Sequence, residues 1–181
     1  MAEYDRMLAG VSLERDELTE ILAALVQLAS VDGEFGDTEH QMILTLMEHY
    51  APRPLGAEEL RALLDRPVDT GRIAHPEAAL LLCLMLAYAD GTYSGPEGTF
   101  LSQLSAALGV APERLEELHL AVRIKVFSAI AEAAIAASPT RSADDQPVIE
   151  EVRRALRLDE ETAAREIAAV QRELSSRTIS D

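Results

Sequence analysis

The longest uncharged apolar stretch of the chain runs over 12 residues, from Ala78 to Ala89. A helix that crosses a bilayer needs about 20 such residues, so this stretch is too short to span a membrane. It is typical of a helix in the core of a globular protein. We expect this core helix to begin near Pro76, because proline suits the first helical turn, and to reach Tyr88 or Ala89.

The composition favours helices throughout. Apolar residues make up 48% of the 181 residues, which is typical of a globular chain. Ala and Leu supply most of this apolar content, and both favour helix. Runs of β-branched residues, the usual sign of strands, are missing. The sequence therefore predicts an all-α fold, a helical bundle of about seven to eight helices.

Apolar residues at steps of three and four place the helices along the chain. Leu18, Ile21, Leu22 and Leu25 give the first predicted helix one apolar face, and Ser12 is its predicted N-cap. Gly109 and Asp159 are predicted to cap later helices. The polar stretch 138–146 is predicted to be a linker. The pattern predicts helices over 13–30, 38–50, 57–65, 76–89, 96–108, 112–137, 148–158 and 160–174.

One short pattern occurs twice. ASVDGEFGDTE begins at Ala29 and AYADGTYSGPE begins at Ala87, 58 residues later. Each copy follows an apolar predicted helix and contains Asp-Gly, an aromatic residue and a Glu near the start of the next helix. The segments after the two copies are also alike. The sequence therefore predicts two similar helical-hairpin halves, over 12–65 and 72–130, that pack about a pseudo-two-fold axis.

The repeated loop has one purely structural interpretation. Ser94-Gly-Pro-Glu97 fits a capping box, in which Glu97 reaches back to the backbone amide of Ser94. Gly33 and Gly91 would supply positive φ where each incoming helix ends. Tyr93 would pack beneath the loop as an anchor. On this interpretation the acids only cap helices.

A second interpretation is a metal site. Asp precedes the Gly in both copies, and an acid pair recurs at the same spacing of seven residues. If the halves pack as predicted, four carboxylates converge, and their repulsion needs a cation to offset it. All-oxygen ligands favour a divalent cation such as Ca²⁺, Mg²⁺ or Mn²⁺. The predicted metal ligands are Asp32, Glu39, Asp90 and Glu97.

Charge and the remaining motifs exclude other classes. The net charge of −16 argues against nucleic acid and against an anionic membrane surface as partners. The chain has no Gly-rich phosphate loop, no G-x-S-x-G and no H-E-x-x-H, so we expect no enzyme and no catalytic or organic cofactor site. The four histidines are predicted at the surface or at helix caps. The single cysteine, Cys83, is predicted to be inert packing in a reducing cytoplasm.

A helix ending in Ala-x-x-Asp-Gly, followed by a short loop and a Glu at the next helix start, resembles the TerB family. That family includes tellurite-resistance proteins and the N-terminal domain of DjlA-type co-chaperones. The resemblance covers about 16–134. It implies an all-helical TerB-like domain over 1–137, a divalent-cation site at the motif acids and a role in stress-response assemblies. Residues 138–181, the linker and two C-terminal helices, have no counterpart in the family pattern.

Two functions follow from the sequence. The first is a non-enzymatic, cytoplasmic protein that binds a divalent cation, a protein partner or both through its two acidic loops. The alternative is a metal-free interaction module in which the acids only cap helices. Insertion into a membrane is not expected, and self-association stays open. The last helix has a narrow apolar stripe that is too small to be stable alone, so we expect it to dock onto the core or onto a partner.

Overall fold

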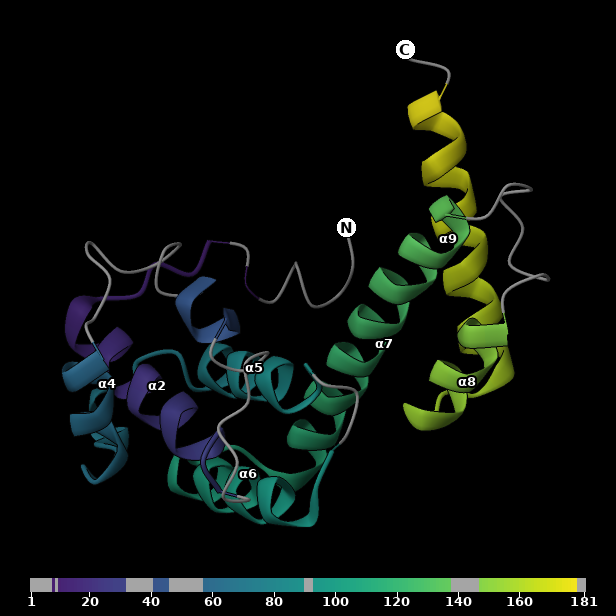
Figure 1. Cartoon of the computed structure of the whole chain (residues 1–181). Helices are drawn as coiled ribbons and strands as arrows, with labels where there is room; N and C mark the ends of the chain where they lie inside the picture. The colour runs from purple at the N-terminus through teal and green to yellow at the C-terminus, as the bar shows by residue number, and fades with distance from the viewer. Residues whose placement is uncertain are drawn as a thin grey trace. The chain divides into compact units, whose positions relative to one another are not determined.

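The computed structural model describes residues 8, 10–31, 41–45, 57–89, 93–137 and 147–178. These residues contain helices and no strand, which confirms the predicted all-α class. No helix within the described ranges is long and apolar enough to cross a membrane. The elements, labelled in Figure 1 apart from η1, are α2 (Arg15–Leu28), α4 (Ala57–Leu64), the 3-10 helix η1 (Thr70–Arg72), α5 (Pro76–Ala87), α6 (Gly95–Ala107), α7 (Pro112–Ala137), α8 (Pro147–Ala155) and α9 (Glu160–Thr178).

The chain forms two compact units, one up to His119 and one from Leu120 onward. The division falls inside α7, so this helix begins in the first unit and ends in the second. The TerB-like domain over 1–137, with its boundary in the linker, stays a prediction.

The first unit is built on α5. The apolar stretch forms this helix as predicted, with Pro76 in its first turn. Nine of its twelve residues are buried, so α5 needs neighbours on several sides. It contacts both α2 and α6, and α2 also contacts α4 and η1. Burying one Leu side chain stabilises a fold by about 1.5–3 kcal/mol, so the five buried leucines of α5 anchor this unit.

The start of α2 differs from the prediction. The helix begins at Arg15, two residues later than expected, and Glu14 rather than Ser12 is its N-cap residue. The first helical hydrogen bond runs from Leu18 N to Glu14 O, which fixes this start. Glu14 makes no side-chain cap, but acids fill the first turn, where the helix dipole favours negative charge.

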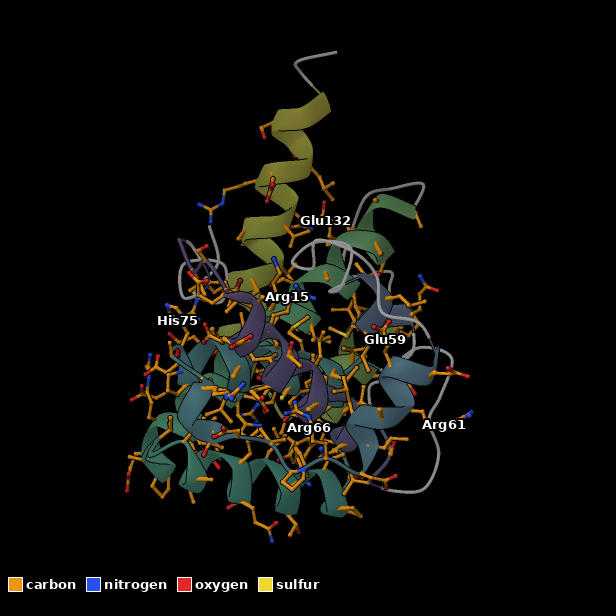
Figure 2. All side chains as sticks on the ribbon, turned by 90° about the vertical axis from the view of Figure 1, so that its left-hand side faces the viewer. Arg15, Glu59, Arg61, Arg66, His75 and Glu132 are labelled. Atoms are coloured by element: carbon orange, nitrogen blue, oxygen red, sulfur yellow. The ribbon has the colours of Figure 1, made fainter. Side chains whose placement is uncertain are left out.

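Two glutamates on α2 are buried, and neither was predicted to be so from the sequence. Glu20 is 1% exposed and accepts hydrogen bonds from Arg66 Nη1 at 2.9 Å and from Asp69 N at 3.0 Å. Glu17 is 2% exposed and accepts from His75 N at 2.7 Å. The imidazole Nδ1 of His75 lies 3.0 Å from Glu17 Oε2. The two carboxylates therefore tie the connection between α4 and α5 to α2. Arg66 and His75 are labelled in Figure 2.

The carboxamide of Gln27 holds the end of α4 against α2. Its Nε2 donates to Leu63 O at 3.0 Å and to Arg66 O at 2.6 Å. Carbonyls at a helix C-terminus have no partner within the helix, so Gln27 satisfies groups that would otherwise lack one. The predicted helix over 57–65 is thus confirmed and its end is explained.

The second unit contains the C-terminal half of α7 with α8 and α9. Arg123 Nη1 donates to Leu156 O at 3.3 Å, and Ser128 Oγ donates to Glu166 Oε2 at 3.3 Å. The last two predicted helices are confirmed, and α9 docks within this unit as expected of its narrow apolar stripe. Asp159 caps α9 as predicted, since its Oδ1 accepts from Thr162 N at 2.7 Å. The buried residues of this unit include Phe127, Ala131, Ile135, Ile149, Leu156, Leu158, Ala163 and Val170.

The internal duplication stays a prediction. The second helix of the first half was expected over 38–50, and only its residues 41–45 lie within the described ranges, where they are helical. The linker 138–146 lies outside the described residues. The third helix of each half differs in length, since α4 has 8 residues and α7 has 26.

The substitution Glu20→Gln tests how much the buried carboxylate contributes to stability, and how this contribution depends on pH. Burial raises the pKa of Glu20, but hydrogen bonds from Arg66 and from the Asp69 backbone outweigh this, so the net shift is below the ordinary value of 4.5. A lowered pKa stabilises the fold above 4.5, and this stabilisation is lost as the pH falls toward the folded-state pKa. We expect Glu20→Gln to cost about 2 kcal/mol at neutral pH.

Melting temperatures measured between pH 3 and 7 (roughly the range over which carboxylates titrate) check this expectation. The curve of Glu20→Gln should be flatter than that of the wild type on the acid side. Glu14→Gln is the matched control, because Glu14 is an exposed acid on the same segment and makes no cap bond. Equal slopes for all three proteins would contradict the role of Glu20.

Two helices end in the same hydrogen-bond pattern with different residues in the left-handed position. After α6, Gly109 has φ +71°, and Val110 N donates to Ser105 O at 3.0 Å. After α8, Arg157 has φ +51°, and Leu158 N donates to Arg153 O at 3.0 Å. This is the Schellman motif, and glycine adopts its left-handed residue without steric cost. Gly109 was predicted as a cap, whereas Arg157 was not.

A reciprocal pair of substitutions tests these caps. Gly109→Ala should destabilise the first unit by about 1 kcal/mol, because only the backbone is strained; a Cβ at Gly109 meets no atom within 4 Å. Arg157→Gly should stabilise the second unit by about 0.5–1 kcal/mol. Urea unfolding followed by circular dichroism measures both changes. Changes of the same sign in the free energy of unfolding of the two variants would show that strain at the left-handed residue does not control these two helix ends.

Candidate functional site

The structure describes one of the four predicted metal ligands, Glu97. Asp32, Glu39 and Asp90 lie outside the described residues, as do Gly33 and Gly91. Glu97 lies in the first turn of α6, where only 6% of its surface is exposed. The described part of the candidate site is therefore Glu97 and its neighbours.

Glu97 closes a capping box at the start of α6. Its Oε2 accepts from Ser94 N at 2.6 Å, and its own backbone N donates to Ser94 Oγ at 3.3 Å. The capping box predicted for this copy is thus confirmed. One carboxylate oxygen of Glu97 is committed to the helix start, which fixes the position of the whole carboxylate.

A cluster of three rings, Tyr88, Tyr93 and His119, lies beside this helix start. The two tyrosine rings stack with centroids 5.1 Å apart, and the imidazole stands edge-on to both. Tyr88 Oη lies 3.3 Å from Nδ1 of His119, and Tyr93 Oη lies 3.4 Å from Nε2. In the neutral imidazole one nitrogen donates and the other accepts, so in that form one tyrosine hydroxyl donates to the ring and the other accepts.

The prediction for His119 was wrong. Only 7% of its surface is exposed, whereas a surface or cap position was expected. His119 falls on the buried face of α7 with Leu115 and Leu118, and the two tyrosine hydroxyls pair its polar nitrogens. For His75 the prediction was right, since it is the N-cap residue of α5. His40 and His49 lie outside the described residues.

Negatively charged side chains lie near the hydroxyl of Tyr93. Burial raises the pKa of its phenol, and the nearby Tyr88, Glu97 and Glu116 raise it further, to about 12. The phenol therefore stays neutral at physiological pH. Tyr93 contacts Tyr88 and His119, and 37% of its surface stays exposed. Its predicted role as an anchor beneath the loop stays a prediction, because residues 90–92 lie outside the described residues.

A groove opens next to Tyr93, between α6 and the start of α7. Its volume is about 530 Å³. Its lining includes small and apolar residues, and the charged residues among its described lining are Glu113 and Glu116. The described residues that line it are Tyr93, Gly98, Ser102, Ser105, Ala106, Val110, Pro112, Glu113, Leu115, Glu116 and His119.

The arginine nearest to these acids in sequence is held elsewhere. Arg114 donates from Nε and Nη2 to Glu77 on α5, at 2.9 and 2.7 Å, and it also pairs with Glu117. These hydrogen bonds raise the pKa of Arg114 and lower that of Glu77. Arg114 does not line the groove, so Glu113 and Glu116 set the sign of its charge.

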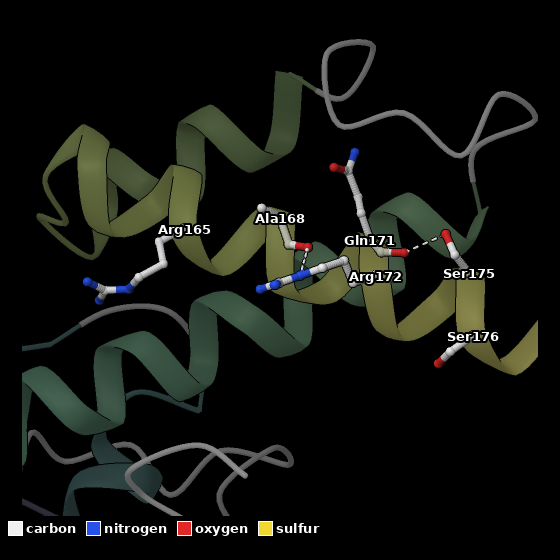
Figure 3. A pocket seen from close by; sticks show the side chains of 6 residues that line it. All are labelled: Arg165, Ala168, Gln171, Arg172, Ser175 and Ser176. Atoms are coloured by element: carbon white, nitrogen blue, oxygen red, sulfur yellow. Dashed lines mark hydrogen bonds between the residues drawn. The ribbon is translucent and has the colours of Figure 1, made fainter.

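A second hollow, of about 740 Å³, lies along α9. Its described lining residues all come from that one helix, as Figure 3 shows. Within it, Arg172 Nε donates to Ala168 O and Ser175 Oγ donates to Gln171 O. These are bonds within the helix, so this hollow is an open helix face and lacks the convergent groups of the groove.

The described residues offer no reactive thiol and no ready-made metal site. Cys83 is fully buried in α5, and burial raises the pKa of its thiol to about 12, which disfavours the reactive thiolate. No group of three or more His, Cys, Asp or Glu side chains within the described ranges is arranged to hold a metal ion. The metal prediction depends on Asp32, Glu39 and Asp90 and is not tested by this finding.

No family model, no curated protein and no solved structure matches the chain. The resemblance to the TerB family therefore rests on the repeated motif alone.

Gly98 makes room for the Tyr93 ring, and this generates a test. A Cβ at Gly98 would lie 3.2 Å from Tyr93 Oη, whereas a Cβ at Gly95 would meet nothing within 4 Å. Gly98 lies inside α6, where a change to Ala gains helix propensity, about 1 kcal/mol, whereas Gly95 is the first helical residue and precedes Pro96, which removes this gain. We expect Gly95→Ala to leave the stability nearly unchanged, and Gly98→Ala to gain less than helix propensity alone would give because Tyr93 must shift.

Thermal melts and the NMR signals of the His119 ring measure these two effects. Gly98→Ala should move the imidazole signals, whereas Gly95→Ala should leave them in place. Identical melts and spectra for the two variants would show that Gly98 does not position Tyr93.

Proposed function

We propose that this chain is a non-enzymatic, TerB-like protein that binds a divalent cation, a protein partner or both through its two Asp-Gly loops. The cation would be Ca²⁺, Mg²⁺ or Mn²⁺, with Asp32, Glu39, Asp90 and Glu97 as ligands. The observation that carries this proposal is the recurrence of Asp-Gly and Glu at the same seven-residue spacing, 58 residues apart.

The position of Glu97 supports the proposal. Its carboxylate is buried at the start of α6 and fixed by the capping box, so its orientation requires no further ordering when a ligand binds. The net charge of −16 adds a long-range attraction for cations and for basic proteins. Both features suit a binding protein of this kind.

The metal-free interaction module is the second candidate, and one specific observation favours it. Glu97 makes both hydrogen bonds of a complete capping box, so capping alone accounts for this residue. On this account the acids stabilise helix starts, and a protein partner is bound by the surface beside them.

The cellular setting rests on two sequence arguments: the single cysteine suits a reducing cytoplasm, and the resemblance to the TerB family implies a stress-response role. We infer a cytoplasmic protein that takes part in a stress-response assembly. A direct role in tellurite chemistry is not part of the proposal, because the family name records a phenotype.

Melting temperatures with and without a chelator separate the two candidates. Bound metal at a hundredfold excess over its dissociation constant would stabilise the fold by about 2.7 kcal/mol, and the chelator would remove this. Asp32→Asn, Glu39→Gln, Asp90→Asn and Glu97→Gln should each reduce the chelator effect, because these cations depend on carboxylate charge. Glu97→Gln should keep the helix cap, since Gln also serves in a capping box.

The matched controls are Asp65→Asn and Glu151→Gln, which remove one charge each from exposed positions. These controls should keep the full chelator effect. A wild-type melting temperature that responds to neither chelator nor added Ca²⁺, Mg²⁺ or Mn²⁺ would favour the metal-free module.

A further inference from the structure

We propose that the groove between α6 and α7 binds a basic segment of a partner protein, with a Lys or Arg side chain held between Tyr93, Glu113 and Glu116. This inference names the chemistry of the partner and rests on the protein-binding part of the proposed function. It does not depend on whether the loops bind a cation.

The charges of the groove select a cationic occupant. Glu113 and Glu116 are three residues apart on α7, so their side chains lie on neighbouring positions of one helix face. Both are exposed, and both line the groove. None of the described lining residues is a lysine or an arginine. A carboxylate or phosphate group would therefore meet repulsion here, whereas an ammonium or guanidinium group would be attracted.

The exposed part of Tyr93 adds an aromatic contact. Its ring is fixed by the stack on Tyr88 and by the edge-on contact with His119, so little order is lost when a partner binds. Cations are attracted to tyrosine rings, by about 0.5–1 kcal/mol at exposed sites. Burial and the nearby Tyr88, Glu97 and Glu116 raise the pKa of the phenol, so the ring stays neutral beside these acids.

The shape of the groove suits a short peptide segment. Its volume of about 530 Å³ exceeds that of one side chain, and its lining includes the small or apolar residues Gly98, Ala106 and Val110. Such a lining accepts the aliphatic stem of a lysine or arginine, whose head group then reaches the carboxylates. A second copy of this chain is disfavoured as the occupant, since two chains of charge −16 repel each other.

Binding of labelled model peptides to the full chain tests the proposal. The probes are a fluorescein-labelled peptide of alternating Lys and Ala and its Glu–Ala counterpart of equal length. Fluorescence anisotropy gives the affinity, and amide NMR shifts give the location. We expect the Lys–Ala peptide to bind with shifts centred on 93–119, and the Glu–Ala peptide not to bind.

Three variants define the groove. Glu113→Gln combined with Glu116→Gln should weaken binding roughly three- to tenfold, and high salt should abolish the difference. Tyr93→Leu should weaken it about threefold, whereas Tyr93→Phe, which keeps the ring, should not. The charge-matched control is Glu151→Gln combined with Glu161→Gln, two exposed acids of the second unit. Melting temperatures verify that each variant is folded.

Several outcomes would overturn the proposal. One is an equal loss of affinity in the control pair, which would mean that only net charge matters. Others are shifts centred outside the groove, or self-association of the chain that the Glu113 and Glu116 changes disrupt. The peptide test can fail while metal binding holds, and metal binding can fail while the peptide binds, so the two proposals are tested separately.

Discussion

Burial of α5 is the constraint on which the first unit depends. Nine of its twelve residues are inaccessible, so neighbouring helices must cover it on several sides. The helices α2 and α6 meet this need, and both contact it. The two polar groups that α2 buries, Glu17 and Glu20, are both used to bind the connection that leads into α5. Apolar burial thus fixes α5, and two buried carboxylates fix the chain that enters it.

The start of α6 serves both stability and the proposed binding. The capping box of Ser94 and Glu97 sets where the helix begins, and Tyr93 immediately before it joins the stack with Tyr88 beside His119. A group that is already ordered by the fold binds a ligand at lower entropic cost. Tyr93, which lines the acidic groove, is therefore already ordered for the proposed binding of a partner segment.

Local signals made much of the fold predictable. Periodic apolar residues gave the helices, and proline, glycine and the S-x-x-E pattern gave the caps at Pro76, Gly109 and Glu97. Features that depend on distant contacts were not predictable. Glu17 and Glu20 look like ordinary surface acids of a helix until Arg66 and His75 are placed beside them. The burial of His119 likewise depends on two tyrosines from elsewhere in the sequence, whose hydroxyls pair its nitrogens. Arg157 carries no signal for a left-handed residue, since glycine is the usual choice there.

Paramagnetic broadening by Mn²⁺ in NMR spectra of the full chain tests the central claim most directly, because it reports where a divalent cation resides. At substoichiometric Mn²⁺ the account predicts early loss of the amide signals of both motifs, 29–39 and 87–97, with Ser94 and Glu97 among the first. Excess Mg²⁺ should restore them, as expected of a shared oxygen-ligand site. Broadening that instead follows exposed acids throughout the chain, such as Glu160 and Glu161 on α9, would contradict a cation site at the repeated motif.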